Sequence, residues 1–225
     1  MKTFEPQYQW QVELQKKKGP VNMGLTSGST YITDPKRLVF LLSRYKFASK
    51  MINGKDNVVE IGCGDGFGSQ LLTQTVGNYT GVDIDDIFVE DARSRFSGDT
   101  AKKFISHDII DGGPLEKQFS SAVSLDVLEH IDGVYEDIYF RNICNSLTSD
   151  AIFIVGMPSI ESQPYASGGG EGHVNCKTGE DLFALTKKHF ENALLFSMND
   201  EVVHTGYARM AQYILCIGLH PIVNS

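Results

Sequence analysis

The segment VVEIGCGDGFGSQ, residues 58–70, constrains the fold more than any other part of this sequence. A short apolar run at 58–61 breaks into glycines at every second position, which are Gly62, Gly64, Gly66 and Gly68. A run of this length that ends in glycines predicts a buried strand followed by a tight turn. Such turns let a nucleotide-like ligand approach the backbone closely. The segment therefore predicts an α/β protein with a ligand at the carboxyl end of this strand.

Strand and helix patterns alternate through most of the chain. A helix is expected to begin at Asp34 and Pro35, with Asp34 as N-cap and Pro35 in the first turn. Strands are predicted at 58–61, 79–83, 103–106, 121–125, 151–156, 193–198 and 211–217, and helices at 66–76, 86–96, 130–147 and 178–189. This order predicts an α/β, Rossmann-like, doubly wound sheet of seven strands, mostly parallel, with helices on both faces. No helix separates the last two strands, so they are expected to pair antiparallel at one edge.

Residues 1–34 differ from the rest of the chain because they are polar and irregular. The stretch GPVNMGLTSGST, residues 19–30, holds too many Gly, Ser and Thr residues for a packed helix. We therefore expect 1–34 to form a tail or a lid segment, and 35–225 to form a single ligand-binding domain.

Composition narrows the classes of partner. The formal net charge is -8, from 28 acidic and 20 basic residues, which argues against a long nucleic-acid footprint. The cysteines have no C-x-x-C spacing, and reduced thiols in a cytoplasmic protein are the simplest interpretation. The first residues lack the apolar core of a secretory signal, and no apolar run has the length of a membrane span.

Acidic residues near three predicted strand ends indicate which ligand the glycine loop holds. Glu60 precedes Gly62 and would repel a pyrophosphate but attract a cationic amino group. Asp83 is placed to accept from ribose hydroxyls, with Ile84 beside it to pack on an adenine face. Asp108 follows the third strand and is placed to accept from an adenine amine. Both aspartates could instead cap turns.

The motifs VVEIGCGDG, GVDID, SHDII and SLDVLEHI, in this order and spacing, resemble those of the class I S-adenosylmethionine-dependent methyltransferases. The resemblance covers roughly residues 35–217. It implies that Glu60 and the backbone of the glycine loop face the methionine part of S-adenosylmethionine, that Asp83 holds the ribose, and that Asp108 flanks the adenine. It also implies a contact from the preceding helix to the methionine carboxylate, by Arg44 or Tyr45. The cofactor-binding residues it implies are Glu60, Gly62, Cys63, Gly64, Asp83, Ile84, Asp108, Ile109, Leu125 and Arg44.

The segment LDVLEH, residues 125–130, is the candidate catalytic region. Asp126, Glu129 and His130 would share one face if a helix began there. Two carboxylates and an imidazole on one face suit a divalent cation such as Mg²⁺ or Mn²⁺, and His173 could supply a fourth ligand. The pattern resembles two metal-dependent branches of the family, the ubiquinone-biosynthesis O-methyltransferases and the small-RNA ribose 2′-O-methyltransferases. Asp126 stands where those carry a glutamate, and its shorter side chain reaches less far.

Other interpretations of this region remain open. Asp126 and Glu129 have the spacing of a capping box, which needs no metal. Asp126 could simply face the cofactor. His130 or His173 could act as a general base without a cation, and the catalytic candidates are therefore Asp126, His130 and His173.

The acceptor is predicted from loops at 1–34, 157–177 and 199–210, which combine polar residues with tyrosines. This content suits O-methylation of a small polar acceptor, such as a sugar or nucleotide-linked sugar. The alternatives are a metal-dependent RNA 2′-O-methyltransferase that binds RNA through Lys16, Lys17 and Lys18, an N-methyltransferase, a non-catalytic cofactor-binding subunit and an NAD-dependent oxidoreductase. Nucleic acid and membranes are not expected partners.

Overall fold

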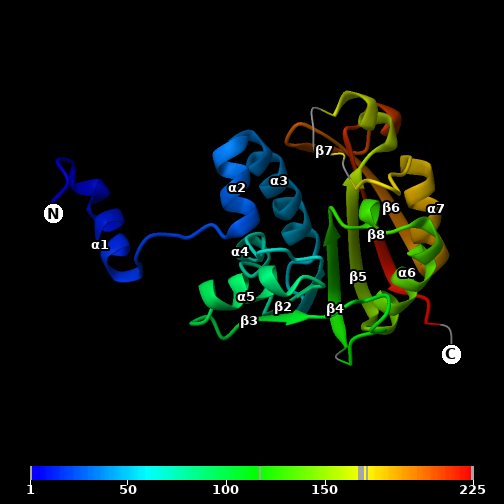
Figure 1. The fold of residues 1–225 in the computed structure, drawn as a ribbon, viewed down its shortest axis with the longest axis horizontal. Helices are drawn as coiled ribbons and strands as arrows, with labels where there is room; N and C mark the ends of the chain where they lie inside the picture. Colours follow the sequence, from blue (N-terminus) through cyan, green and yellow to red (C-terminus); the bar gives the residue numbers. More distant parts are fainter. Residues whose placement is uncertain (1, 117, 167–169, 171, 224–225) are drawn as a thin grey trace.

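A mixed sheet of eight strands runs through the molecule (Figure 1). The computed structural model describes residues 2–116, 118–166, 170 and 172–223. The order of strands across the sheet is β3-β2-β1-β4-β5-β8-β6-β7. The strands are β1 (Asn57–Ile61), β2 (Asn78–Asp83), β3 (Lys102–Ser106), β4 (Phe119–Leu125), β5 (Leu147–Pro158), β6 (Phe190–Asn199), β7 (Val202–His204) and β8 (Tyr213–Pro221).

The first five strands are parallel, and this brings their carboxyl ends to one edge. Strand β1 lies in the middle of this part and pairs with β2 on one side and β4 on the other. Glu60 is opposite Gly81 of β2 and Val123 of β4. The loops after β1, β2 and β4 therefore meet at the same edge, where open α/β sheets bind ligands.

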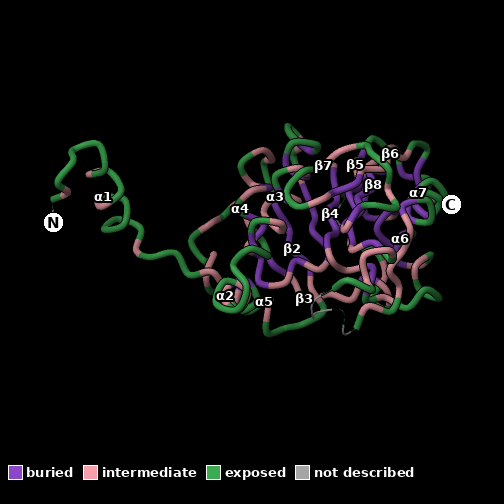
Figure 2. Tube along the Cα trace, turned by 90° about the horizontal axis from the view of Figure 1, so that it is seen from above, coloured by how far each residue is buried: buried purple, intermediate pink, exposed green. Residues whose placement is uncertain are grey.

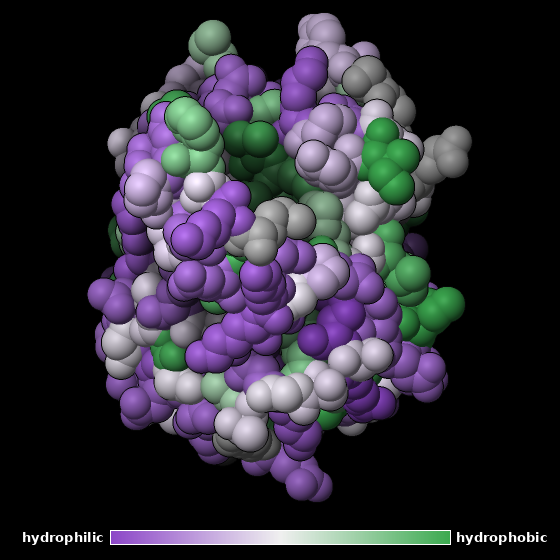
Figure 3. Space-filling model, turned by 90° about the vertical axis from the view of Figure 1, so that its left-hand side faces the viewer, coloured by the Kyte–Doolittle hydropathy of each residue, from purple (hydrophilic) through white to green (hydrophobic). Residues whose placement is uncertain are grey.

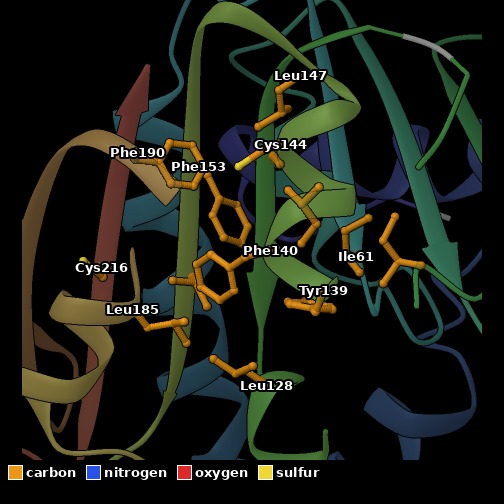
Figure 4. Packing of buried hydrophobic residues seen from close by; sticks show 14 of the residues in the cluster. Ile61, Leu128, Tyr139, Phe140, Cys144, Leu147, Phe153, Leu185, Phe190 and Cys216 are labelled. Atoms are coloured by element: carbon orange, nitrogen blue, oxygen red, sulfur yellow. The ribbon is translucent and has the colours of Figure 1, made fainter. Parts of the chain in front are cut away.

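Helices cover both faces of the sheet, as predicted (Figure 1). The α-helices are α1 (Gln9–Lys18), α2 (Leu25–Thr33), α3 (Pro35–Met51), α4 (Ser69–Leu72), α5 (Asp86–Arg95), α6 (Glu136–Asn145) and α7 (Gly179–His189). One apolar cluster contains buried residues of α6 and α7, and Figure 4 shows Phe140 of α6 beside Phe153 of β5, with ring centroids 5.5 Å apart. A second cluster contains buried residues of α3, α4 and α5. The sheet is thus the middle of three layers.

The antiparallel end of the sheet is confirmed, with one difference in detail. Strand β8 does not lie at the edge, because it pairs antiparallel with both β5 and β6. A short additional strand, β7, folds back on β6 as a hairpin and gives the sheet eight strands rather than the predicted seven. The β7 segment has only three residues, too few to show an alternating pattern.

Two predicted helices are wrong in their bounds. The segment expected to be helical at 66–76 contains only the four-residue α4, because Gly66 has a φ of 68°, outside the helical region. The helix expected at 130–147 begins at Glu136 and follows two short 3₁₀ helices, η2 (Leu128–His130) and η3 (Gly133–Tyr135). Local turns therefore replace helix on the ligand-binding side of both segments.

The N-terminal segment contains two helices that behave differently. Helix α1 stands apart from the sheet and its residues are largely exposed (Figures 1 and 2). Helix α2 packs beside α3, so the expectation that 19–30 avoids a packed helix is wrong. Contacts of Ser27, described below, offset the poor helix propensity of its Gly, Ser and Thr residues. Within the described residues, no helix has the length and apolar character needed to cross a membrane.

Helix α3 begins after Asp34, as predicted, and its packing on the glycine segment can be tested. A Cβ atom at Gly68 would overlap the ring of Tyr45, whereas one at Gly98 would meet nothing within 4 Å. Replacement of Gly68 by Ala should therefore lower the free energy of unfolding by about 1–3 kcal/mol, and Gly98→Ala should change it by less than about 0.5 kcal/mol. Urea denaturation of both variants measures this. Equal stability of the two would mean that Tyr45 does not pack here.

Candidate functional site

The glycine loop begins directly after β1 and is shaped by two close neighbours. A Cβ atom at Gly62, where φ is 74°, would overlap the side chain of Val127. Gly64 also has a positive φ, of 51°, but nothing lies within 4 Å of its Cβ position. Its amide donates to Asp83 Oδ2 at 2.8 Å. The loop thus leaves open space at Gly64 into which a ligand could approach the backbone, which fits the predicted cofactor site.

Glu60 lies beneath this loop rather than in it. The side chain is 1% exposed, and its two oxygens accept hydrogen bonds from the hydroxyls of Tyr45 and Tyr79. Burial raises the pKa of Glu60 to about 7, although the two tyrosine hydrogen bonds oppose the rise. Direct contact between Glu60 and the cofactor remains a prediction, and in this structure the carboxyl supports the loop from below.

The residues predicted to hold adenosine lie at the ends of β2 and β3. Asp83 accepts from the amides of Gly64 and Asp85, and Ile84 is 71% exposed beside it. Asp108 accepts hydrogen bonds from the amides of Ile110 and Asp111. This is the turn-capping role that the sequence left open as the alternative to adenine binding. Three predicted residues have buried side chains, so a ligand would meet mainly their backbone: Cys63, Ile109 and Leu125. The roles of all these residues in cofactor binding remain predictions.

Arg44 and Asp126 form an ion pair beside the loop. Arg44 Nη1 donates to both carboxylate oxygens of Asp126, at 2.8 and 2.6 Å, and its guanidinium lies 3.6 Å from the centroid of the Tyr213 ring. Asp126 has a φ of 59°, in the left-handed region. The condition for a shared helical face of Asp126, Glu129 and His130 is therefore not met, because the chain turns sharply at Asp126 and then forms the single 3₁₀ turn of η2.

The structure brings together Glu129, His130 and His173, three of the four predicted metal ligands. One ligand atom from each lies within 4.8 Å of those of the other two. The carbonyl of Glu129 accepts from the amides of Val174 and Asn175, at 2.8 and 3.0 Å. These bonds hold the segment after β5 against η2 and place His173 beside His130, with ring centroids 5.0 Å apart. The fourth predicted ligand, Asp126, is bound to Arg44 instead.

Among the described residues, each of the two histidines makes a hydrogen bond through Nδ1 and none through Nε2. His130 Nδ1 lies 3.1 Å from the carbonyl oxygen of Gly172, and His173 Nδ1 lies 2.9 Å from Gln163 Oε1. Both partners are acceptors, so each Nδ1 carries the hydrogen and each Nε2 keeps its lone pair. Histidines that bind a metal through Nε2 typically donate a hydrogen bond from Nδ1 to an oxygen atom.

Glu129 has an incomplete set of partners. Its Oε2 atom is buried and has no hydrogen-bond partner among the described residues. Burial, and then the charge of Asp126, raise the pKa of Glu129 to about 8. Burial and the neighbouring His130 lower the pKa of His173. A divalent cation would supply the positive charge that Glu129 lacks, so the three residues fit a cation site.

One group of residues at the site was missed from the sequence. Asp65, within the glycine loop, is 4% exposed and accepts from the amide and hydroxyl of Ser27, at 2.7 and 3.1 Å. Arg95 of α5 donates to the carbonyl of Asp65. These hydrogen bonds therefore hold helix α2 against the glycine loop. Helices α2 and α5 lie at the end of the molecule that Figure 3 shows, and the surface there is mainly hydrophilic. The only sequence signal was Asp65 itself, among glycines.

Comparisons with known proteins bear on the family and the fold of this chain. Residues 59–155 match a family described as a methyltransferase domain, and no curated protein matches the sequence significantly. The N-methyltransferase NodS from Bradyrhizobium japonicum WM9, in complex with S-adenosyl-L-homocysteine, has a TM-score of 0.61 at 15% identity, over 85% of this chain and 91% of that chain. The methyltransferase domain of bacterial CtHen1 has a TM-score of 0.65 at 14% identity, over 84% and 99%.

A third similar structure is a possible histamine N-methyltransferase from Thermotoga maritima, with a TM-score of 0.63 at 18% identity, over 84% of this chain and 96% of that chain. At these identities the likeness shows the fold alone. The same fold thus occurs in proteins that are described as different methyltransferases.

The environment of Glu60 predicts how stability depends on pH. Its pKa is raised in the folded protein, so the native state holds a proton that the unfolded chain loses above about pH 4.5. This contribution is complete below pH 4.5 and is lost as pH rises through about 7. The Glu60→Gln variant should therefore lose less stability between pH 5 and pH 8 than the wild type, by roughly 3 kcal/mol at most.

Urea denaturation across this pH range checks the expectation. Glu90→Gln, on the exposed side of α5, is the matched control and should keep the wild-type dependence. An unchanged pH dependence in Glu60→Gln would contradict a protonated Glu60.

Proposed function

We propose an acceptor class and a cation for this chain, which the family match and the fold identify as a class I S-adenosylmethionine-dependent methyltransferase. The proposed reaction is O-methylation of a small polar acceptor, such as a sugar or nucleotide-linked sugar. The observation that carries the proposal is the convergence of Glu129, His130 and His173 at the end of β4. A hydroxyl acceptor must lose a proton during methyl transfer, and this group can assist that loss.

The proposed donor site follows the residues around the glycine loop. The backbone at Gly62 and Gly64 would lie against the methionine part, where Gly64 leaves open space. Asp83 would orient the ribose, and exposed Ile84 would pack on the adenine. Because S-adenosylmethionine is already activated, the main task of these residues is to align its methyl group with the acceptor.

The proposed cation site uses one carboxylate oxygen of Glu129 and the free Nε2 atoms of His130 and His173. Gly172 and Gln163 hold the two rings in the required tautomer. A bound divalent cation would lower the pKa of an acceptor hydroxyl. The bond from sulfur to the methyl carbon breaks as the bond to the acceptor oxygen forms, and the hydroxyl proton leaves.

One further candidate function is supported by a specific observation. The chain shares its fold with the methyltransferase domain of CtHen1 at a TM-score of 0.65, and the ligand pattern of this site resembles that of the small-RNA 2′-O-methyltransferases. The exposed run of Lys16, Lys17 and Lys18 ends α1 and could contact a phosphate backbone. The net charge of -8 still favours a small acceptor.

Variants of the three ligands test the proposal. Glu129→Gln, His130→Ala and His173→Ala should each weaken Mn²⁺ binding by about 10–100-fold, as measured by calorimetry. The rate at which a labelled methyl group is transferred to sugars, nucleotide-linked sugars or short RNA should fall in the same three variants. The control is His220→Asn, an exposed position near the end of the otherwise largely buried β8, because Asn tolerates the φ of 57° found there.

The same assay separates the alternatives. Methyl transfer only to amines, with full activity in all three variants, would contradict the proposal and favour an N-methyltransferase. Salt-dependent transfer to RNA alone would favour the RNA 2′-O-methyltransferase.

A further inference from the structure

A cavity of about 430 Å³ lies between the segment after β5 and the first turn of α7. Two short 3₁₀ helices contribute to its wall, η4 (Ile160–Tyr165) and η5 (Ala208–Met210), and they lie side by side at the top of Figure 1. The volume is within the range of small-molecule sites. None of the residues proposed above for the cofactor or the cation lines this cavity.

Hydrogen bonds hold the walls of the cavity together. The hydroxyl of Ser159, at the start of η4, donates to the carbonyl of Ala211, at the end of η5, at 2.6 Å. The amide of Ile160 donates to the carbonyl of Lys177, just before α7, at 3.0 Å. The three segments that meet at the cavity are therefore tied to one another, and its shape is part of the fold.

Glu161 brings a carboxylate to this cavity that lacks a partner. Its Oε2 atom is buried and has no hydrogen-bond partner among the described residues. Arg209, the basic residue of the lining, lies 3.6 Å from Glu180 instead, and these two side chains are 61% and 78% exposed. A buried carboxylate oxygen without a donor costs free energy, so the cavity favours a ligand that donates a hydrogen bond and carries positive charge.

The other groups of the lining agree with this preference. The first turn of α7 contains Glu180 and Asp181, which compensate the positive end of the helix dipole. Thr178 caps the same helix by accepting from the amide of Asp181 at 3.0 Å. The ring of Tyr207 is 65% exposed beside them, and the face of such a ring attracts a cation.

The cavity is distinct from the proposed cation site, although η4 borders both. Gln163 Oε1 lies 2.9 Å from His173 Nδ1, whereas Glu161 lines the cavity. Two positions along a 3₁₀ helix are roughly 240° apart, so the two side chains leave η4 in different directions. Among the described residues, no group of three potential metal ligands lines the cavity, so an organic cation fits it better than a metal ion.

We propose that this cavity binds a small organic molecule through a primary ammonium group, with Glu161 as the acceptor and Tyr207 against the carbon skeleton. The hydrogen bond from an ammonium group to Glu161 is charge-assisted, and it gives the buried Oε2 atom the donor that it lacks. An amino sugar combines such a group with a ring that can lie against Tyr207. This inference goes beyond methyl transfer and does not rest on the cation site.

Binding of glucosamine and of glucose to the full chain tests the proposal. The two sugars differ in one ammonium group that replaces a hydroxyl. Ligand-observed NMR at pH 7, without cofactor or metal, should show that glucosamine binds about tenfold more tightly, because hydrogen bonds to charged groups are stronger by about this factor. Equal affinity for the two sugars, or no binding of glucosamine, would overturn the proposal.

Variants assign the binding to the cavity. Glu161→Gln keeps the size of the side chain and removes its charge, and it should lower the affinity for glucosamine about tenfold, to that for glucose. Glu191→Gln removes an exposed carboxylate of β6 outside the cavity and should keep the wild-type affinity. A tenfold preference for glucosamine that persists in Glu161→Gln contradicts the role of Glu161.

Amide chemical shifts of the wild type decide the question if Glu161→Gln does not fold. Glucosamine should shift the signals of Gly206 and Ala208, which line the cavity. Shifts centred on Val174 and Asn175, whose amides bond the Glu129 carbonyl, would place the ammonium group at the cation site and overturn the proposal. Mn²⁺ binding and methyl transfer are measured separately, so this inference and the proposed function can each fail without the other.

Discussion

The buried hydrogen bonds from Tyr45 and Tyr79 to Glu60 are the interaction on which the site depends. They join α3, β1 and β2 directly beneath the glycine loop, and all three side chains are at most 6% exposed. A buried carboxyl is tolerated because both oxygens have donors. This junction fixes α3 against the loop, and α3 in turn presents Arg44 to Asp126 at the end of β4. The glycine loop and the candidate catalytic region are thus positioned by the same helix.

The strands around the loop could be predicted because their signals are local. Apolar runs between turn residues indicate strands, and the glycines at 62–68 require a turn wherever they occur. The helical face across 126–130 could not be excluded from the sequence, because an aspartate can adopt either helical or left-handed backbone angles, and only the structure shows the φ of 59° at Asp126 and its ion pair with Arg44. A contact between residues 82 positions apart leaves no local pattern.

The same reasoning explains the errors in the N-terminal segment. Gly, Ser and Thr disfavour helix in isolation, yet α2 forms because Asp65 accepts the amide and hydroxyl of Ser27 near its start. His173 was expected as a possible ligand beside His130 because its loop follows the fifth predicted strand. The physical cause of their proximity, the two amides that bond the Glu129 carbonyl, became visible only in three dimensions.

Acidic groups around the glycine loop affect which charged ligands can bind there. Buried or partly buried carboxyl groups at Glu60, Asp65 and Glu129 surround it, and the pKa values of Glu60 and Glu129 are raised to about 7 and about 8. A raised pKa means that the carboxyl group keeps its proton further up the pH scale, and a positive charge brought close to it favours the ionised form. S-adenosylmethionine brings a sulfonium and an ammonium group, whereas the product that remains after methyl transfer has lost the sulfonium charge. If the donor bound beside these carboxyl groups as proposed, its positive charge would favour their ionised form, and the neutral sulfur of the product would not.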